Sequence, residues 1–407
     1  MKRKCLWSTL ASALLSAPLQ AGDGLFSFFA NYSTGQLEVL EHDPVSGQPL
    51  GTRVFVDTGG MASPTGLAWH RDRFITIIQN QAGHRGMVEI HPATGVGDLV
   101  GWSGMQLFSQ WPESDPASGE LLYMAWESFN TRRFYRVDPL TGVTTPSVLL
   151  HGATTALDSF CIDSTGRGFG TVNLDLYSFD PSSGLTIFLG PLAATSAANF
   201  FGDLACSSTG DIVGLLLENP PYATTGLYRI DPSALTATPL VLMPGHSVPA
   251  LGVAFAPDRS GTRYCQAKPN SLSCLPSIRA HGFPSTTANG GYEISCSNVR
   301  SQTQGVLLHG IGGAQSLPFQ GGILCIAGPL RRTQGVNSQG SPPGSPNCDG
   351  SWTVDFNAHL WQFASGSPAQ SLPPGTTIHA QWYGRDQGYG APNNTSLSDG
   401  LRITLMP

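Results

Sequence analysis

Two aspartates occupy matching places in a repeated pattern and are the first residues that could do chemistry. Asp158 and Asp203 each open a short apolar segment that ends in cysteine, Asp158-Ser-Phe-Cys161 and Asp203-Leu-Ala-Cys206. The two carboxylates could hold a hard cation such as Ca²⁺, or act as an acid and a base with separated pKa values. The other copies of the segment open with glycine and add no ligand. The simpler interpretation is structural, with each carboxylate accepting backbone N–H bonds.

The cysteines indicate disulfides and an oxidising compartment. Seven of the eight follow residue 21, and five of those lie beyond residue 264, a density that is unusual in a reducing cytosol. We predict bridges Cys265–Cys274 and Cys325–Cys348, each of which closes a loop rich in Pro, Ser and Gly. Cys161 and Cys206 match each other and either form a bridge between repeats or pack as buried thiols. The odd number leaves a free thiol, and Cys296, inside an apolar segment, is the first candidate.

The histidines show no spacing typical of a metal site, such as HxH, HExxH or Hx₃H. His70 and His246 stand next to copies of the repeated segment, where they could reach a shared ligand site. A surface or loop position is the simpler interpretation for both. The sequence also lacks a Gly-x-Ser-x-Gly elbow, a P-loop and a GxGxxG motif. It therefore names no nucleophile and no phosphate site.

The elements that must position these residues follow from a repeat. An alternating apolar run, then Asp-Pro or a close variant, then a turn that usually contains glycine, recurs at residues 37–44, 87–92, 134–139, 176–181 and 227–232. Alternation with period two predicts strands with one buried face. Asp bonds the backbone two residues on and Pro fixes φ at the corner, so each copy predicts a hairpin.

The segments that carry the two aspartates alternate with these hairpins. They occur at residues 66–69, 104–107, 158–161, 203–206 and 252–255, which gives a period of roughly 40 to 55 residues and about four short strands per repeat, as in a propeller blade. The chain begins with a hairpin that lacks its leading strand and ends the repeat region with a strand that lacks its hairpin. We therefore predict a β-propeller over residues 22–262, with five blades and one blade completed from both ends. Six blades are the alternative, because residues 100–128 are long enough to contain additional strands.

In a propeller the leading strands line a central channel, with Asp158 and Asp203 near it and His70 and His246 at its mouth. The pattern Leu-Tyr-x-Ile/Val-Asp-Pro-x-Thr-Gly, clearest at residues 134–142 and 227–232, resembles repeats of secreted bacterial propellers of the NHL, YVTN and gluconolactonase-like types. This resemblance implies the fold and carries no activity with it.

Residues 263–407 have a different composition, with cysteines, Pro/Ser/Gly loops and short apolar runs but no helical periodicity. Strands are expected at residues 292–299, 305–309, 321–327, 352–357, 376–383 and 401–405, which predicts an antiparallel β-sandwich or jelly roll. The segments at residues 264–271, 318–322, 330–333 and 381–386 resemble a C-terminal module of exported planctomycete and deltaproteobacterial proteins. That resemblance implies attachment or sorting.

The first 21 residues have the features of a signal peptide. Lys2, Arg3 and Lys4 precede an apolar stretch that ends near Ala17, and Ala21 is a suitable cleavage residue. We expect export to the periplasm or the cell exterior. Because no later run reaches about 18 apolar residues, the mature chain is expected to lack a transmembrane segment. A net charge of −6 with 12% charged residues leaves no basic stripe for nucleic acid.

These features favour a secreted, non-enzymatic binding or scaffold protein. Its propeller face would engage a glycan, peptide or protein partner, and its C-terminal module would serve attachment or sorting. The alternative is a metal-dependent, lactonase-like propeller hydrolase or lyase with a channel cation held by Asp158 and Asp203. A structural component of the cell envelope is a third interpretation.

Overall fold

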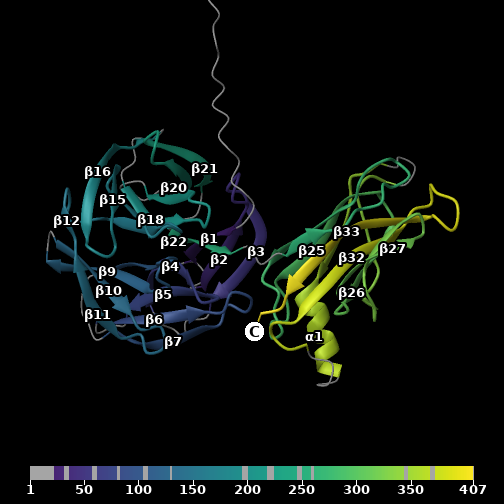
Figure 1. Ribbon diagram of the computed structural model, residues 1–407, viewed down its shortest axis with the longest axis horizontal. Helices are drawn as coiled ribbons and strands as arrows, with labels where there is room; N and C mark the ends of the chain where they lie inside the picture. The colour runs from purple at the N-terminus through teal and green to yellow at the C-terminus, as the bar shows by residue number, and fades with distance from the viewer. Residues whose placement is uncertain are drawn as a thin grey trace, which may run out of the picture.

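Five antiparallel β-sheets surround a common axis in the N-terminal part of the chain, and a second group of sheets follows (Figure 1). The structure, a computed structural model, describes residues 23–31, 36–56, 62–79, 83–103, 109–128, 131–194, 200–217, 224–244, 250–257, 261–342, 347–366 and 372–406. The predicted signal peptide (residues 1–21), residues 104–107 and His246 lie outside these ranges.

Four of the five sheets are formed by consecutive strands, numbered outward from the axis. The second sheet contains β4 (Ala62–His70), β5 (Arg73–Gln79), β6 (Arg85–Ile90) and β7 (Gly97–Trp102). The third contains β8 (Ser109–Ser114), β9 (Leu121–Ser128), β10 (Thr131–Val137) and β11 (Thr144–Leu149). The fourth contains β13 (Ser159–Ile162), β14 (Gly168–Val172), β15 (Asp175–Phe179) and β16 (Leu185–Pro191), with β12 (His151–Gly152) parallel to β16. The fifth contains β18 (Phe200–Cys206), β19 (Ile212–Leu217), β20 (Thr224–Asp231) and β21 (Thr236–Pro244), with β17 (Ala193–Ala194) parallel to β21.

The first sheet is completed from both ends of the repeat region. Its innermost strand, β22 (Ala250–Pro257), pairs with β1 (Asp23–Asn31), which is followed by β2 (Gln36–His42) and β3 (Pro49–Val56). The inner strands β22, β4, β8, β13 and β18 contact one another in a closed ring. The all-β propeller fold is thus confirmed, and the described residues form five sheets around the axis, with residues 100–128 supplying strands of the second and third sheets.

The innermost described strand of the third sheet was not predicted. It is β8, Ser109–Ser114, and the predicted segment 104–107 lies outside the described residues. The sequence Ser-Gln-Trp-Pro-Glu-Ser opens with neither Gly nor Asp and has a proline inside the strand, so it lacked the signature that marked the other inner strands.

The hairpin turns form as the Asp-Pro pattern predicts. Asp43, for example, accepts hydrogen bonds from the N–H groups of Val45 (3.0 Å) and Ser46 (2.7 Å). In the second sheet His91 replaces the aspartate, and its Nδ1 accepts from the N–H of Ala93 at 3.2 Å.

The C-terminal part contains two sheets that enclose one apolar core. One has the order β23 (Thr262–Tyr264), β33 (Thr395–Thr404), β32 (Thr377–Arg385), β26 (Gln304–Gly310) and β29 (Arg331–Arg332), with β30 (Val336–Asn337) also on β26. The other has the order β24 (Ser277–Gly282), β25 (Tyr292–Val299) and β31 (Gly350–Asp355), and a hairpin joins β27 (Ala314–Phe319) to β28 (Gly322–Ile326). The core centres on Trp352 and Trp382, whose rings stack 5.8 Å apart. Gly384 must be glycine here, because a Cβ would lie 2.1 Å from the Trp352 ring.

A helix in this region corrects the expectation of strands alone. The predicted strand over residues 352–357 ends at Asp355, and α1 (Phe356–Gly366) follows it. Asp355 caps the helix, because its carboxylate accepts the N–H of Ala358 at 2.9 Å. Within the described ranges, no helix is long and apolar enough to cross a membrane.

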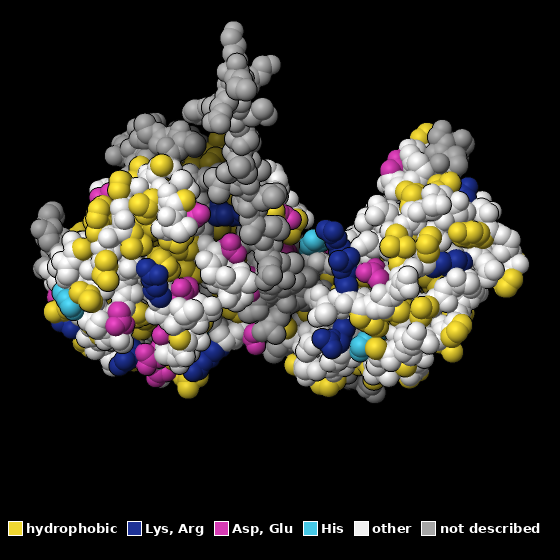
Figure 2. Space-filling view, turned by 45° about the horizontal axis from the view of Figure 1, so that its top comes forward, with side chains coloured by type: hydrophobic (Ala, Val, Ile, Leu, Met, Phe, Trp, Pro, Cys, Tyr) yellow, Lys and Arg dark blue, Asp and Glu magenta, His cyan; other side chains and the backbone are white. Residues whose placement is uncertain are grey.

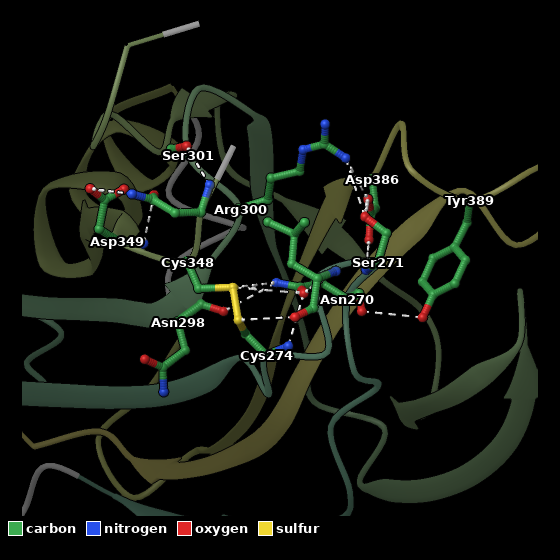
Figure 3. Close-up of a disulfide and its surroundings, with 12 residues drawn as sticks. Asn270, Ser271, Cys274, Asn298, Arg300, Ser301, Cys348, Asp349, Asp386 and Tyr389 are labelled. Carbon is green, nitrogen blue, oxygen red and sulfur yellow. Dashed lines mark hydrogen bonds and ion pairs between the residues drawn. A yellow bond between two sulfur atoms is a disulfide. The ribbon is translucent and has the colours of Figure 1, made fainter. Parts of the chain in front are cut away.

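The disulfide pairing also differs from the prediction. All four predicted cysteines are bridged, but as Cys265–Cys325 and Cys274–Cys348, and a third bridge joins Cys161 and Cys206. The predicted partners are neighbours in sequence, whereas the fold brings together cysteines 60 and 74 residues apart. Figure 3 shows the Cys274–Cys348 bridge beside Asn270, which accepts the N–H of Cys274 at 3.0 Å. Cys296 is the free, buried thiol, as predicted.

An aromatic contact joins the two parts of the molecule. Phe283, which follows β24, stacks on Trp69 of the propeller with ring centroids 5.5 Å apart and also contacts Phe26 and Phe74. Asn357 of α1 fixes the Phe283 loop by donating to the Phe283 carbonyl at 2.9 Å. Beside this contact is a hollow lined by Asp23, Glu41 and Asp43 from the propeller and by Arg263 and Arg279 from the C-terminal part. Figure 2 shows Lys and Arg side chains on the side of the C-terminal part that faces the propeller. The two parts are thus held by apolar packing with charge complementarity at its edge.

Candidate binding site at the mouth of the channel

A cavity of about 220 Å³ lies where the five inner strands end. One residue from each strand forms its rim: Trp69, Ser114, Ile162, Cys206 and Phe255. Each of the five lies close to the end of its inner strand, within two residues of the last pair in the register. The repeat thus generates a five-membered rim whose side chains differ, and these differences give the cavity its chemistry.

His70 supplies a polar group that lacks a partner. The side chain is 4% exposed and lines the cavity, its Nδ1 lies 3.0 Å from the Ser114 hydroxyl, and its Nε2 has no hydrogen-bond partner. Burial, assisted by the charge of Arg71, lowers the pKa of His70 to about 4, so the ring is neutral at pH 7. A buried nitrogen without a partner costs stability, and a ligand atom that bonds Nε2 would recover it.

Glu113 is one of two acidic residues that line the cavity, the other being Asp23. It lies one residue before the rim residue Ser114 and is half-buried. Burial raises the pKa of Glu113 well above its usual range, and the negative charge of Asp203 raises it further. Glu113 therefore holds its proton more readily than an ordinary glutamate and can present an O–H donor to the cavity.

Asp203 lies deeper in the channel and serves the inner strands. It is 1% exposed, and its carboxylate accepts N–H bonds from Val253 at 2.9 Å and Leu204 at 3.0 Å. Burial raises the pKa of Asp203, and these N–H groups together with that of Leu67 oppose the rise. Because the innermost strand of each sheet has an open edge, this carboxylate satisfies donors that no strand pairs.

Asp158 does not occupy the position of Asp203. Ile162 and Cys206 are equivalent in the register, which makes Ser159 the counterpart of Asp203 and places Asp158 one residue earlier. Asp158 lies 3.4 Å from Arg132 Nη2 and accepts the N–H of Asn173 at 2.9 Å. Successive residues of a strand point to opposite faces, so a shift of one residue changes the side that a carboxylate faces. The two aspartates have different partners, and the carboxyl group close to Asp203 is that of Glu113.

Of the other residues expected at the mouth, His70 lines the cavity and His246 lies outside the described residues. Glu113 was missed, because Pro-Glu within β8 carries no repeat signature. Counting back from the hairpin turn between β8 and β9 would have placed it next to the rim residue Ser114. Where the structure describes the chain, no group of three or more His, Cys, Asp or Glu side chains is placed so that it could hold a metal ion. A Ca²⁺ site at Asp158 and Asp203 stays a prediction.

No protein-family model matches the sequence, and no curated protein sequence matches it. Solved structures with some similarity include TolB from Acinetobacter baumannii, at 11% identity and TM-score 0.36, over 57% of this chain and 66% of that one. A gluconolactonase from Xanthomonas campestris has 14% identity and TM-score 0.36, over 57% and 84% of the two chains. Hydrazine synthase from Kuenenia stuttgartiensis has 11% identity and TM-score 0.30, over 58% and 63%. This chain thus spans less than two thirds of TolB and of hydrazine synthase, and such low scores carry no argument about function.

Proposed function

We propose that this chain is an exported binding protein whose channel mouth receives a neutral, hydroxyl-bearing group, such as the terminal sugar of a glycan. The observation that carries the proposal is the buried, unpartnered Nε2 of His70 in the wall of the cavity. A buried polar group in a native protein usually has a hydrogen-bond partner, and a ligand in the cavity would supply one for Nε2.

The charge state of the cavity supports a neutral ligand. His70 is uncharged at pH 7, and Glu113 is held toward its protonated form. The cavity is also lined by Arg71 and Asp23, whose opposite charges offset each other, so its polar groups carry little net charge, while Trp69 and Phe255 supply apolar wall. Sugar-sized molecules present this combination of hydroxyl groups and apolar ring faces.

The size of the cavity supports a small group. At about 220 Å³, it exceeds the roughly 150 Å³ that accommodates benzene in an engineered cavity. A six-membered ring with hydroxyl groups is of this order, whereas a folded partner would reach the cavity only with a protruding residue. In this proposal the signal peptide directs the chain out of the cytoplasm and the C-terminal part serves attachment.

The test is titration of the mature chain with neutral monosaccharides and their methyl glycosides, followed by calorimetry or ligand-observed NMR. We expect at least one sugar to bind, and Glu113→Gln and His70→Gln each to weaken it about tenfold or more. The matched control is Glu120→Gln, because Glu120 pairs with Arg136 at the surface, 2.8 Å away. Absence of sugar binding, or equal affinity in all variants, would overturn the proposal.

A lactonase-like activity remains the rival, and the proximity of Glu113 and Asp203 in the channel is the observation that favours it. Hydrolysis of sugar lactones that depends on added Ca²⁺ and is lost in Glu113→Gln would establish it in place of simple binding. Absence of turnover with and without Ca²⁺, together with sugar binding, would decide for the binding protein.

A further inference from the structure

We propose that the C-terminal part binds one divalent transition-metal ion, such as Cu²⁺ or Zn²⁺, between His309 and His359. The two histidines lie outside the propeller cavity, and the inference is independent of the function proposed above.

The geometry of the two rings carries this proposal. His309 lies on β26 and His359 on α1, and they are 3% and 8% exposed. Their Nε2 atoms are 3.0 Å apart and the rings are nearly perpendicular, at 89°. Two nitrogens bound at about 2.0–2.1 Å lie roughly 3.3 Å apart in a tetrahedral site and about 2.9 Å apart at a right angle. The observed separation falls within this range. The Nε2 atoms point at each other in a hydrogen bond, so an ion requires each ring to turn its lone pair toward a shared point while the distance stays the same.

The surroundings hold both rings in place. Phe356 packs edge-on against His309, with ring centroids 5.1 Å apart, and stacks on His359. The Asp355 cap fixes the start of the helix that carries His359. Pre-positioned rings lose little freedom when an ion binds, which favours affinity.

The hydrogen bond between the rings fixes the position of one proton. Because the two Nε2 atoms 3.0 Å apart share one hydrogen bond, one of them donates and the other accepts through its lone pair. In the metal-free protein one ring donates its Nε2–H to the other. On binding, that proton moves to Nδ1 of the same ring, so both Nε2 lone pairs face the ion with no net proton release.

A groove reaches one of the two histidines, His359. It has a volume of about 520 Å³ and is lined by His359, Arg332, Thr333, Gln334 and Gln362, among others. Gln362 lies three residues after His359 on α1, and side chains so spaced share a helix face. Two protein nitrogens with water leave an open site, unlike the closed four-ligand sites that only stabilise a fold.

The neighbouring charges indicate what else the ion would carry. Arg331 on β29 is the register partner of His309 on β26. Both Arg331 and Arg332 are exposed. Their charge disfavours a bare dication and favours an ion that also carries a hydroxide or a carboxylate. The groove therefore suits a small anionic ligand bound at the metal.

The test is titration of the mature, metal-free chain with CuCl₂ and separately with ZnCl₂, by calorimetry and by pulsed electron paramagnetic resonance of the copper form. We expect one ion per chain and coupling to two imidazole nitrogens. His309→Gln and His359→Gln should each weaken binding tenfold or more, and the double variant should abolish it. His379→Gln is the matched control, because His379 lies in the same sheet with Tyr264 and not a histidine as its partner.

Two results would overturn the inference. One is a copper spectrum of the unaltered protein without two imidazole nitrogens, a measurement that does not depend on any variant folding. The other is an unchanged stoichiometry and affinity in a double variant whose circular dichroism is native.

Discussion

The two parts of this molecule differ in how far apart in sequence their paired strands lie. In the propeller, strands mostly pair with their neighbours in sequence, and the same aspartate-based turn recurs from sheet to sheet. In the C-terminal part, β23 pairs with β33 from the far end of the chain, and two disulfides span 60 and 74 residues. In a repeat, the local sequence specifies the fold. Strand pairs that are far apart in sequence are instead held by disulfides and aromatic packing.

The largest effect should come from the Cys274–Cys348 bridge. Replacing both cysteines by serine releases a loop of 74 residues and should cost about 4 kcal/mol. Unfolding should be followed in denaturant through the fluorescence of the buried Trp352 and Trp382. The control is Cys296→Ala, which alters the same core without touching a bridge and should cost about 1 kcal/mol. An equal loss in both proteins would show that covalent fixation is not what distinguishes the C-terminal part.

The next effect concerns the contact that joins the parts. Phe283→Ala removes the ring that packs on Trp69, Phe26 and Phe74 and should cost about 3 kcal/mol. Calorimetry should then resolve two transitions in place of one, because the parts lose their common core. Phe188→Ala, at a ring that is 49% exposed in the propeller, should leave the trace unchanged. Two transitions in the unaltered protein would contradict the idea of a common core.

A smaller effect depends on pH and belongs to the propeller alone. The folded pKa of Glu113 is raised by burial and by Asp203, so its contribution is complete below its unfolded pKa of about 4.3 and is lost as pH rises through the folded value. Glu113→Gln should remove a slope of up to about 1.4 kcal/mol per pH unit above that point. Stability measured from pH 4 to 9 should diverge between the two proteins as pH rises. Parallel curves would show that Glu113 ionises normally.

The turn aspartates make the stability depend on pH in the opposite direction. The hydroxyl and N–H of Ser182 hold the pKa of Asp180 below its usual range, and the hydroxyl of Ser233 and the N–H of Ala234 do so for Asp231. Their contribution is present above the unfolded pKa and disappears as pH falls through the folded values. Acid therefore weakens the turns while alkali weakens the channel.

The smallest effect tests the equivalence of the repeats. His91 takes the place of the turn aspartate in the second sheet, so His91→Asp should stabilise the propeller by a few tenths of a kcal/mol, as better caps do. The melting temperature should rise by about 1 °C. His84→Asp, at an exposed position, controls for the change of charge. A lower melting temperature would show that this turn has adapted to histidine.

Much of the fold could be predicted, and the candidate site much less so. Residues 292–299 were expected to be a strand and are β25, because alternation and turn residues act locally. The helix α1 was missed, because it is short and depends on the Asp355 cap and on packing of Phe356 in the core. Glu113 was missed because its place in the ring is defined by strand register, and Asp158 was paired with Asp203 through a register wrong by one residue.

By itself, the sequence determined the period of the repeat, the position of most hairpins, the closure of the ring from both ends and the presence of bridged cysteines. These depend on side-chain alternation and on turn chemistry, which neighbouring residues decide. Only the tertiary structure decided which carboxyl groups approach each other in the channel, which cysteines pair, and that two histidines 50 residues apart meet at 3.0 Å. The reason is that a shift of one residue reverses the face of a strand, and contacts between distant segments exist only once the sheets have packed.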